Sequence, residues 1–395
     1  MASLLSRALI ALVLCTGLSA QAAEPACKAA WPMWTAFAER WVQADGRVLE
    51  SSLKANHSTS EGQAYALFFA LVANDRARFE QIWRWSRENL AGDQPGAMLP
   101  GWLWGQGSDG NWQIQDRNSA SDADLWFAYA LIEADRLWQV PAYRADAQAL
   151  LGQVKAQEVA ELPGLGPTLL PGPVGFAQAD HLWRLNPSYV PLPLLRRVAA
   201  FDAQGPWKGV LQSSAKLLRD GGGQGLAADW VGYRATSAKA GLFVRDATSG
   251  DLGSYDAIRV YLWAGMTDPA DPLAAPVLAA LQGMARLTAA SGVPPEKVAL
   301  ASGHGEGSGP FGFSAALVPY FQANNQPWLA DLQERRARQA LEAALQGTRD
   351  PKLPSVYYDY MLSLFGLGWG EHRYRFAANG QLKPFWESEC SAKAP

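Results

Sequence analysis

Acidic residues open three apolar segments of this sequence, each a short distance after serine. Glu61 lies in HSTSEGQ, Asp122 and Asp124 lie in NSASDAD, and Asp256 lies in GSYD. Serine or threonine before a helix caps its first turn, and an acidic side chain in that turn complements the helix dipole. Ordinary capping therefore explains any one of these segments taken alone.

The same carboxyl groups gain a chemical interpretation if the helices they open run parallel and begin on one face. The carboxyl groups would then crowd one cleft, where burial and mutual repulsion can raise the pKa of one of them. Glycoside hydrolysis requires one carboxyl group that keeps its proton and a second that stays ionised. The segments together therefore favour a site that cleaves a sugar polymer.

Tryptophan is abundant, with 17 residues in the chain, and five of these lie near the acidic segments. Trp102, Trp104 and Trp112 lie in the long loop before the second acidic segment, Trp126 lies one turn into the helix that follows, and Trp183 precedes NPSY. Because an indole ring offers a sugar a rigid apolar face with a polar edge, these five are candidate substrate-binding residues. The alternative is packing between helices, which we expect for Trp31, Trp34, Trp41, Trp83, Trp85 and Trp138.

The hydrophobic periodicity predicts about twelve helical segments of two alternating kinds. One kind is apolar on almost all sides, as in AYALFFALVA, and starts near Glu61, Asp122, Tyr189, Asp256, Phe313 and Val356. The other kind carries charge on one face and starts near Trp31, Asp75, Pro141, Trp207, Pro272 and Pro327. A helix that is apolar all round must be buried, and an amphipathic helix covers it. We therefore expect an all-α toroid in which the inner helices are parallel and their N-terminal ends share one face.

No linker divides the chain, so we expect a single domain over residues 23–395. The Pro/Gly-rich stretch 163–175 and the Gly-rich stretches 221–225 and 303–312 are typical of long loops between helices. Val, Tyr and Phe between Trp230 and Asp246 favour a short β-hairpin. Strand patterns elsewhere are weak.

Charge and composition exclude several functions. The 395 residues include 34 basic and 37 acidic ones, a net charge of −3, so no basic field is available to attract nucleic acid or anionic lipid. Only 4 His and 3 Cys are present, without HExxH or HxH spacing, so we expect no metal and no cofactor. The glycine run 221–225 lacks the Lys and Ser/Thr of a phosphate loop, and no GxSxG motif is present.

The first 22 residues are typical of a secretory signal peptide. Arg7 supplies the positive charge, residues 8–18 are apolar, and AQA at 20–22 resembles a cleavage site. A lipoprotein signal is not expected, because Leu14 precedes Cys15, and no later segment is long and apolar enough for a membrane anchor. The expected location is the periplasm or the medium.

Two cysteines remain after removal of the signal peptide, Cys27 and Cys390, at opposite ends of the mature chain. In an oxidising compartment they can form a disulfide that ties the termini together. The alternative is two unpaired thiols, and the sequence does not give the distance that decides between them.

Longer stretches around the acidic residues resemble glycoside hydrolase family eight. The resemblance lies in HSTSEGQAYALFFALVANDR, NSASDADLWFAYALIEADRLW and GSYDAIRVYLWAGM, and it continues through PGLGPTLLPGPVGF, WRLNPSYVP, PPEKV and GPFGFSAALVPY. Within the family, the sequence is most similar to the secreted endoglucanases that accompany bacterial cellulose synthases. The resemblance implies an (α/α)6 barrel that hydrolyses β-1,4-glucan internally with inversion. It also implies a cellulose chain as ligand and makes the cellulose synthase machinery a candidate partner.

The resemblance further implies roles for single residues. Glu61 in TSEGQ matches the proton donor, and Asp256 in SYDAIR matches the base that activates water. Asp122 matches a third essential acid, a nucleophile or a residue that binds and distorts the sugar; inversion needs no covalent nucleophile, so we favour the second role. Arg259 is expected to keep Asp256 ionised, and Tyr189 to orient the water or the sugar. The two carboxyl groups of an inverting enzyme lie roughly 6.5–9.5 Å apart.

Two other classes of protein are alternatives. A polysaccharide lyase can use a similar toroid, but it favours a Tyr/His pair and a basic groove for uronates, which an acidic cleft opposes. A non-catalytic glucan-binding protein would keep the tryptophans without needing acids at three helix starts. The sequence leaves open the choice among cellulose, chitosan, xylan and mixed-linkage glucan. It also leaves open the oligomeric state and whether newly made cellulose is trimmed or external polymer degraded.

Overall fold

The computed structural model describes residues 30–50, 57–92, 97–346 and 356–391. The predicted signal peptide and Cys27 lie outside these residues, as does the side chain of Cys390. The signal peptide and the Cys27–Cys390 disulfide therefore both remain predictions. Within the described part of the chain, no helix is both long and apolar enough to cross a membrane.

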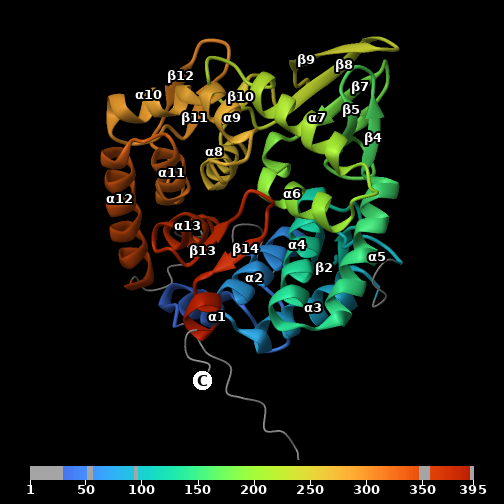
Figure 1. Cartoon of the computed structure of the whole chain (residues 1–395), viewed down its shortest axis with the longest axis vertical. Coiled ribbons are helices and arrows are strands. Elements are labelled where there is room, and N and C mark those ends of the chain that lie inside the picture. The colour runs from blue at the N-terminus through green and yellow to red at the C-terminus, as the bar shows by residue number, and fades with distance from the viewer. Residues whose placement is uncertain (1–29, 51–56, 93–96, 347–355, 392–395) are drawn as a thin grey trace, which may run out of the picture.

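Six helices begin close to the positions predicted for the inner set. They are α2 (Ser60–Val72), α4 (Ser121–Trp138), α6 (Leu192–Phe201), α8 (Ala257–Met266), α11 (Phe311–Ala323) and α13 (Tyr357–Gly370). Each packs on the next in this order, and Phe365 of α13 meets Phe69 of α2 with ring centroids 4.5 Å apart. In α2 every residue except Glu61 is buried, and in α8 all residues are. Helices that are apolar on all sides therefore occupy the middle of the molecule (Figure 1).

The amphipathic helices lie around this inner set (Figure 1). They are α1 (Pro32–Trp41), α3 (Arg76–Leu90), α5 (Pro141–Gln157), α7 (Trp207–Asp220), α9 (Ala274–Ala280), α10 (Gln282–Ser291) and α12 (Pro327–Gln346). Helices α3, α5, α7, α9 and α12 each pack on the inner helix that precedes them in the chain, and α1 packs on α13. The segment predicted near Pro272 is two helices, because Leu281 leaves the helical conformation with φ −109° and ψ 15°. A short helix, α14 (Phe385–Ser391), was not predicted.

The strand content is larger than the sequence pattern predicts. The hairpin expected between Trp230 and Asp246 is present as β8 (Val231–Ser237) and β9 (Ala240–Arg245), and it joins β6 (Ala177–Gln178) and β7 (Leu182–Leu185) in one antiparallel sheet. The other described strands are β1 (Ser58–Thr59), β2 (Leu103–Gln106), β3 (Trp112–Asp116), β4 (Val159–Leu162), β5 (Gly166–Leu169), β10 (Leu252–Gly253), β11 (Lys297–Ala299), β12 (His304–Glu306), β13 (Tyr374–Phe376) and β14 (Leu382–Pro384). Most are two to four residues long, which is too short for a period of two to stand out.

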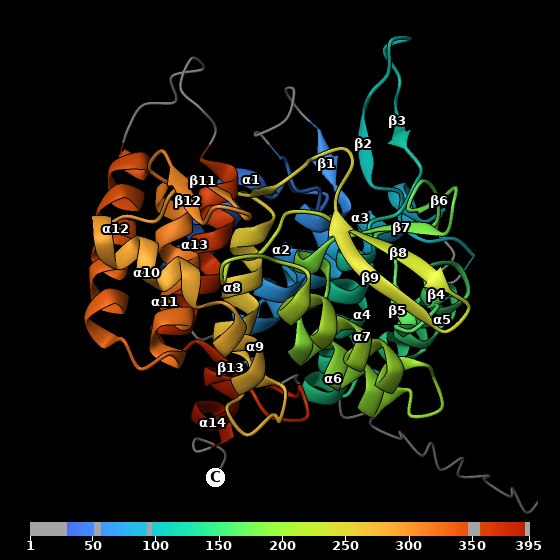
Figure 2. The ribbon, with the colours of Figure 1, turned by 90° about the horizontal axis from the view of Figure 1, so that it is seen from above.

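The segment before Asp122 is therefore a β-hairpin and not the long loop that we predicted. Strands β2 and β3 pair antiparallel, with Trp104 opposite Ile114 and Gln106 opposite Trp112. The short strand β1, which leads into α2, pairs with β2, so the hairpin is attached next to Glu61. Figure 2 shows the hairpin projecting from the body of the protein.

The inner segment expected at Tyr189 also differs in detail. Tyr189 ends a separate 3₁₀ turn (Pro187–Tyr189), and α6 begins only at Leu192. Pro191 and Pro193 lack an N–H and fit best at the first turn of a helix, so a helix that started before them would lose hydrogen bonds. The Asn186 side chain closes the turn by accepting a hydrogen bond from the Ser188 N–H at 2.9 Å.

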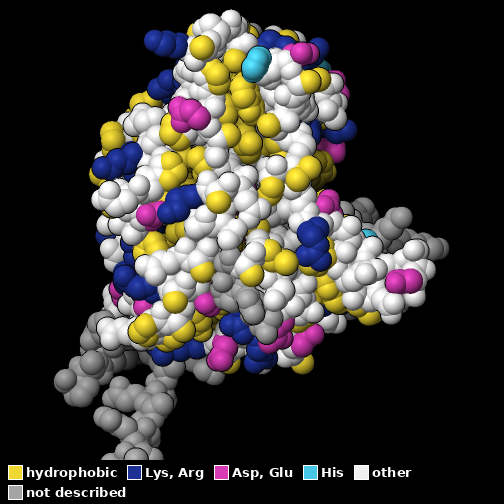
Figure 3. All heavy atoms as spheres, turned by 90° about the vertical axis from the view of Figure 1, so that its right-hand side faces the viewer, with side chains coloured by type: hydrophobic (Ala, Val, Ile, Leu, Met, Phe, Trp, Pro, Cys, Tyr) yellow, Lys and Arg dark blue, Asp and Glu magenta, His cyan; other side chains and the backbone are white. Residues whose placement is uncertain are grey.

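Basic and acidic side chains are interspersed on the face drawn in Figure 3, with apolar side chains between them. That face carries no broad basic area of the kind that binds a nucleic acid backbone.

Candidate active site

The N-terminal ends of the inner helices α2, α8, α11 and α13 meet at one cleft of about 790 Å³. Its wall is formed by the first turns of α2, α8 and α13, together with Pro310 before α11 and Trp102 before β2. The expectation that the inner helices open on one face is therefore confirmed for these elements. Among the predicted acids, Glu61 and Asp256 line this cleft.

Glu61 lies in the first turn of α2, held by the residues of its own motif. The Gly62 N–H donates to Thr59 Oγ1 at 3.1 Å, which caps the helix. A Cβ at Gly62 would lie 2.7 Å from the Tyr357 hydroxyl, so the close approach of α13 requires glycine there. Ser60 Oγ donates to Glu61 Oε2 at 3.2 Å, and Trp102 Nε1 donates to Oε1 at 3.1 Å. Both carboxyl oxygens are thus fixed by neighbouring donors.

Burial raises the pKa of Glu61 well above its ordinary value, and the negative charge of Asp122 raises it further. A carboxyl group whose pKa is raised keeps its proton to a higher pH than an ordinary glutamic acid and can act as a general acid. Glu61 therefore has the raised pKa that we expected, caused by burial and by the charge of Asp122.

Asp122 is completely buried and is not part of the cleft wall. Tyr65 donates to Asp122 Oδ2 at 3.2 Å, Arg259 Nη1 donates to the same oxygen at 3.3 Å, and the Ala123 N–H donates to Oδ1 at 2.9 Å. Burial raises the pKa of Asp122 to about 6, against the opposing effect of Arg259. The Asp122 side chain is not exposed to the cleft, but it contacts Tyr65 and Arg259, which line the cleft wall.

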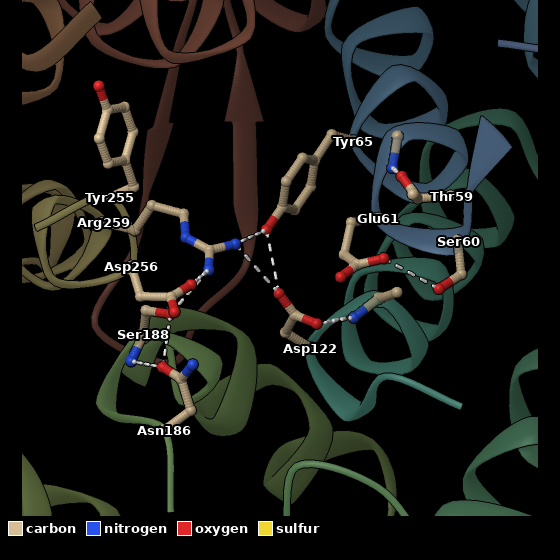
Figure 4. A network of polar contacts seen from close by, with 12 residues as sticks. Thr59, Ser60, Glu61, Tyr65, Asp122, Asn186, Ser188, Tyr255, Asp256 and Arg259 are labelled. Carbon is tan, nitrogen blue, oxygen red and sulfur yellow. Dashed lines mark hydrogen bonds and ion pairs between the residues drawn. The ribbon is translucent and has the colours of Figure 1, made fainter. Parts of the chain in front are cut away.

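Arg259 joins Asp122 to Asp256 (Figure 4). Its Nη2 donates to Asp256 Oδ1 at 2.6 Å and to Ser188 Oγ at 2.9 Å. The Asp256 side chain is 31% exposed, whereas that of Arg259 is 9% exposed. Asp256 therefore combines a tight contact with a cation and access to the cleft, as a base that activates water requires. Figure 4 shows Arg259 and Asp122 lying between Glu61 and Asp256.

Tyr189 and the tryptophans predicted to bind sugar are distributed more widely. Trp102 lines the cleft, and the Tyr189 ring lies 5.8 Å from the Arg259 guanidinium. Trp104 and Trp112 stack on the hairpin with centroids 5.0 Å apart and 17° between their planes, and Trp112 is 44% exposed. Trp183 is half-buried on β7, 6.5 Å from the ring of Tyr233.

The prediction that Trp126 binds substrate is wrong. Its ring has no exposed surface and packs among the rings of Phe68, Trp263 and Phe365 at centroid distances of 4.9, 5.3 and 5.2 Å. One turn into an inner helix, a side chain already points into the core that the six helices share.

Asp124 also departs from expectation, because it faces Glu158 and not the cleft. Both side chains are fully buried, and they form a hydrogen bond with each other. Ser119 Oγ donates to Glu158 Oε1 at 2.6 Å, but neither Asp124 oxygen has a donor if both groups are ionised. Two carboxylates cannot bond to each other, so this pair holds a proton.

Glu158→Gln is expected to weaken the pH dependence of folding stability. Burial raises the pKa of Glu158 from 4.5 to about 8, so the folded protein keeps a proton that the unfolded chain releases. The stability that this proton provides is complete below about pH 4.5 and is lost as the pH rises to about 8. Gln keeps both hydrogen bonds without titrating. Between these pH values, the unfolding constant of the wild type should therefore rise by up to about tenfold more per pH unit than that of the Glu158→Gln variant.

Urea denaturation between about pH 5 and pH 8 measures this difference. Glu161→Gln, at an exposed position three residues further along the chain, is the matched control and should follow the wild type. Equal slopes for Glu158→Gln and the wild type would contradict the shared proton.

The sequence reasoning missed several residues of the cleft. Tyr65 bonds to both Asp122 and Arg259, and Tyr255, Tyr358 and Asp359 line the wall. Burial raises the pKa of Asp359 to about 6. A signal was available for Tyr65, which lies one turn after Glu61 on the same helical face. Tyr358 and Asp359 lie in the first turn of α13, and Tyr255 lies just before the N-cap of α8, so the argument that selected the acids at helix starts applies to them as well.

Comparison with known proteins adds independent findings. Residues 2–372 match Glycosyl hydrolases family 8. An endoglucanase of Pseudomonas fluorescens is 53% identical over 368 residues, which cover 91% of this chain and 92% of that protein. An endo-1,4-D-glucanase structure from Vibrio fischeri superposes with a TM-score of 0.83 at 38% identity, covering 90% of this chain and 99% of that one. For the endo-β-1,4-glucanase CMCax of Acetobacter xylinum, the TM-score is 0.65 at 28% identity, with 85% and 95% covered.

Proposed function

Because the chain belongs to family 8 of the glycosyl hydrolases, we propose that it is an endo-1,4-β-glucanase that inverts the configuration at the anomeric carbon. The observation that carries this proposal is the contrast between two carboxyl groups in one cleft. Glu61 is half-buried, and the loss of solvation raises its pKa, whereas Asp256 contacts the Arg259 guanidinium and reaches solvent. A carboxylic acid and a second carboxylate on opposite sides of the bond are what glycoside hydrolysis requires, and inversion further requires room for a water molecule beside the second one.

The proposed reaction uses each group once. Glu61 gives its proton to the glycosidic oxygen as the bond to the anomeric carbon breaks. Asp256 accepts a proton from a water molecule, whose oxygen attacks the anomeric carbon from the opposite face. Glu61 ends ionised and Asp256 protonated, and exchange with solvent restores both.

For Asp122, the proposed binding and distortion of the sugar requires that substrate entry exposes this buried side chain. Without such a change its effect is electrostatic, because its charge raises the pKa of Glu61 and holds Arg259 against Asp256. Tyr189 is proposed to orient the water or the sugar. Trp102, Trp104, Trp112 and Trp183 are the proposed sugar-binding tryptophans, with Trp102 nearest the bond that is cleaved.

The finer details of fold and setting are part of the same proposal. Six pairs of helices would form an (α/α)6 barrel within a single catalytic domain at 23–395. The protein would be exported by its signal peptide to the periplasm or the medium. A role in cellulose biosynthesis, beside a cellulose synthase, is supported by the resemblance of the sequence motifs.

Incubation with soluble carboxymethylcellulose tests the activity. We expect a rapid fall in viscosity with few new reducing ends, which identifies internal cleavage. Unsaturated products that absorb in the ultraviolet would indicate a lyase, and binding without cleavage would indicate a glucan-binding protein. In parallel assays, hydrolysis of chitosan, xylan and mixed-linkage glucan should be slower than hydrolysis of carboxymethylcellulose. If one of these polymers is hydrolysed faster, that polymer and not cellulose is the preferred substrate.

A further inference from the structure

Asp229 lies outside the cleft, yet its carboxylate holds the chain on both sides of Asp256. Its Oδ1 accepts hydrogen bonds from the N–H groups of Ser254 at 2.7 Å and Ala257 at 2.8 Å. Its Oδ2 accepts a third hydrogen bond, from Ser254 Oγ at 2.5 Å. The Asp229 side chain is buried, and the wall of the cleft does not include it.

The start of α8 needs such an acceptor. The first N–H groups of a helix have no partner within the helix, and a side chain at the N-cap normally meets this need. Here the N-cap residue is Asp256, and its side chain makes no capping hydrogen bond. The Asp256 carboxylate is turned instead towards Arg259. Asp229 thus supplies from another loop the cap that Asp256 does not provide.

The loop that carries Asp229 is itself fixed to α8. The Ala227 N–H donates to the hydroxyl of Tyr261, a buried residue of α8, at 2.9 Å. The Asp229 N–H donates to the carbonyl of Leu252 at 2.9 Å. A Cβ at Gly253 would lie 2.2 Å from the Ala227 carbonyl oxygen, so only glycine permits this contact. The carboxylate therefore acts from a rigid base.

We propose that Asp229 is a positioning residue for the reaction, which fixes the first turn of α8 so that Asp256 stands at the correct place to accept the water proton. Asp229 is not part of the cleft wall, and it acts through the N–H groups of Ser254 and Ala257 and through the hydroxyl of Ser254. The inference rests on the proposed role of Asp256 as the base.

Three variants test this role on soluble cellulose. Asp229→Ala removes all three hydrogen bonds and should lower kcat about 100-fold, the size of effect expected when a reacting group is misplaced by about 1 Å. KM should stay within about twofold of the wild-type value, because the cleft keeps its sugar contacts. Asp229→Asn should recover most of the loss, since its amide oxygen can accept both N–H groups and its NH₂ can donate to Ser254 Oγ. Ser254→Ala removes one hydrogen bond and should give an intermediate loss.

The matched control is Asp271→Ala, beyond the other end of α8. Asp271 is equally buried, accepts the Leu273 N–H at 2.9 Å and pairs with Arg196 through two bonds of 2.7 Å. Its loss should lower the unfolding temperature and leave kcat near the wild-type value. A wild-type kcat in folded Asp229→Ala, or an equal loss of kcat in Asp271→Ala, would overturn the proposal.

Two further outcomes keep the test decisive. If Asp229→Ala does not fold, Ser254→Ala decides the question, and a wild-type kcat in that variant rejects the positioning role. Asp256→Asn is measured in parallel, because high activity there would show that the proposed function of Asp256 is at fault and not the contacts of Asp229.

Discussion

Glu61→Gln is expected to lose activity on soluble cellulose by about a factor of 10³, since a positioned general acid contributes roughly 10²–10⁴ to such a rate. The fold should be unchanged. Gln retains an oxygen that accepts the hydrogen bond from Trp102 Nε1, and it removes a titratable group whose burial opposes ionisation. The loss should therefore appear in kcat, with KM close to that of the wild type.

The choice of leaving group separates an acid from a residue that only binds. A cello-oligosaccharide with a dinitrophenyl leaving group needs little protonation, so Glu61→Gln should cleave it at a rate much nearer to the wild-type rate. Glu80→Gln, an exposed position on α3, is the control and should behave as the wild type on both substrates. If Glu61→Gln loses activity on both substrates by the same factor, Glu61 is not the proton donor.

The pH profile gives a second check on the same residue. The acid must carry its proton, so kcat/KM of the wild type should fall as the pH rises through the raised pKa of Glu61. Because the charge of Asp122 contributes to that raised pKa, Asp122→Asn should move this alkaline limb to lower pH. An unchanged alkaline limb in Asp122→Asn would contradict the coupling.

Much of the helical framework can be predicted from hydrophobic pattern alone. Segments such as those of α2 and α8 are apolar on every side, and only burial among other helices accommodates them. Once such helices are placed in parallel, the residues at their starts must converge, and this located Glu61 and Asp256 in one cleft. The ion pair between Arg259 and Asp256 follows from their spacing of three residues on a helix.

The errors have an equally physical origin. Asp124 lies two residues after Asp122, which is about 200° around the helix, so it faces away from the cleft. Trp126 lies one turn after Asp122 on the same face, but that turn is deeper in the molecule, where its ring packs in the core. The hairpin of β2 and β3 was not predicted, because the register that pairs Trp104 with Ile114 depends on contacts across the turn and not on a local pattern. The contact of Asp229 with Ser254 could not be predicted for the same reason, since the two residues lie 25 positions apart in the sequence.

Asp256→Asn should lower kcat by a factor of about 10²–10⁴, because the attacking water then lacks a proton acceptor. The amide oxygen of Asn can still accept the hydrogen bond that Arg259 Nη2 donates to Asp256 in the wild type, so the fold and the affinity for glucan should persist. The measured changes should be a low kcat, an unchanged KM and wild-type folding stability. A rate near that of the wild type would remove Asp256 from the mechanism.

Azide tests the geometry of the same variant, because this anion can attack without losing a proton. If a water molecule normally attacks from the side of Asp256, azide that enters the same space should restore the rate of Asp256→Asn. The product should be an α-glycosyl azide, since a single displacement at a β-linked carbon inverts its configuration. A β-glycosyl azide, identified by its proton NMR coupling at the anomeric carbon, would require two displacements. That product would assign a covalent intermediate to this site, with Asp122 as the remaining candidate nucleophile.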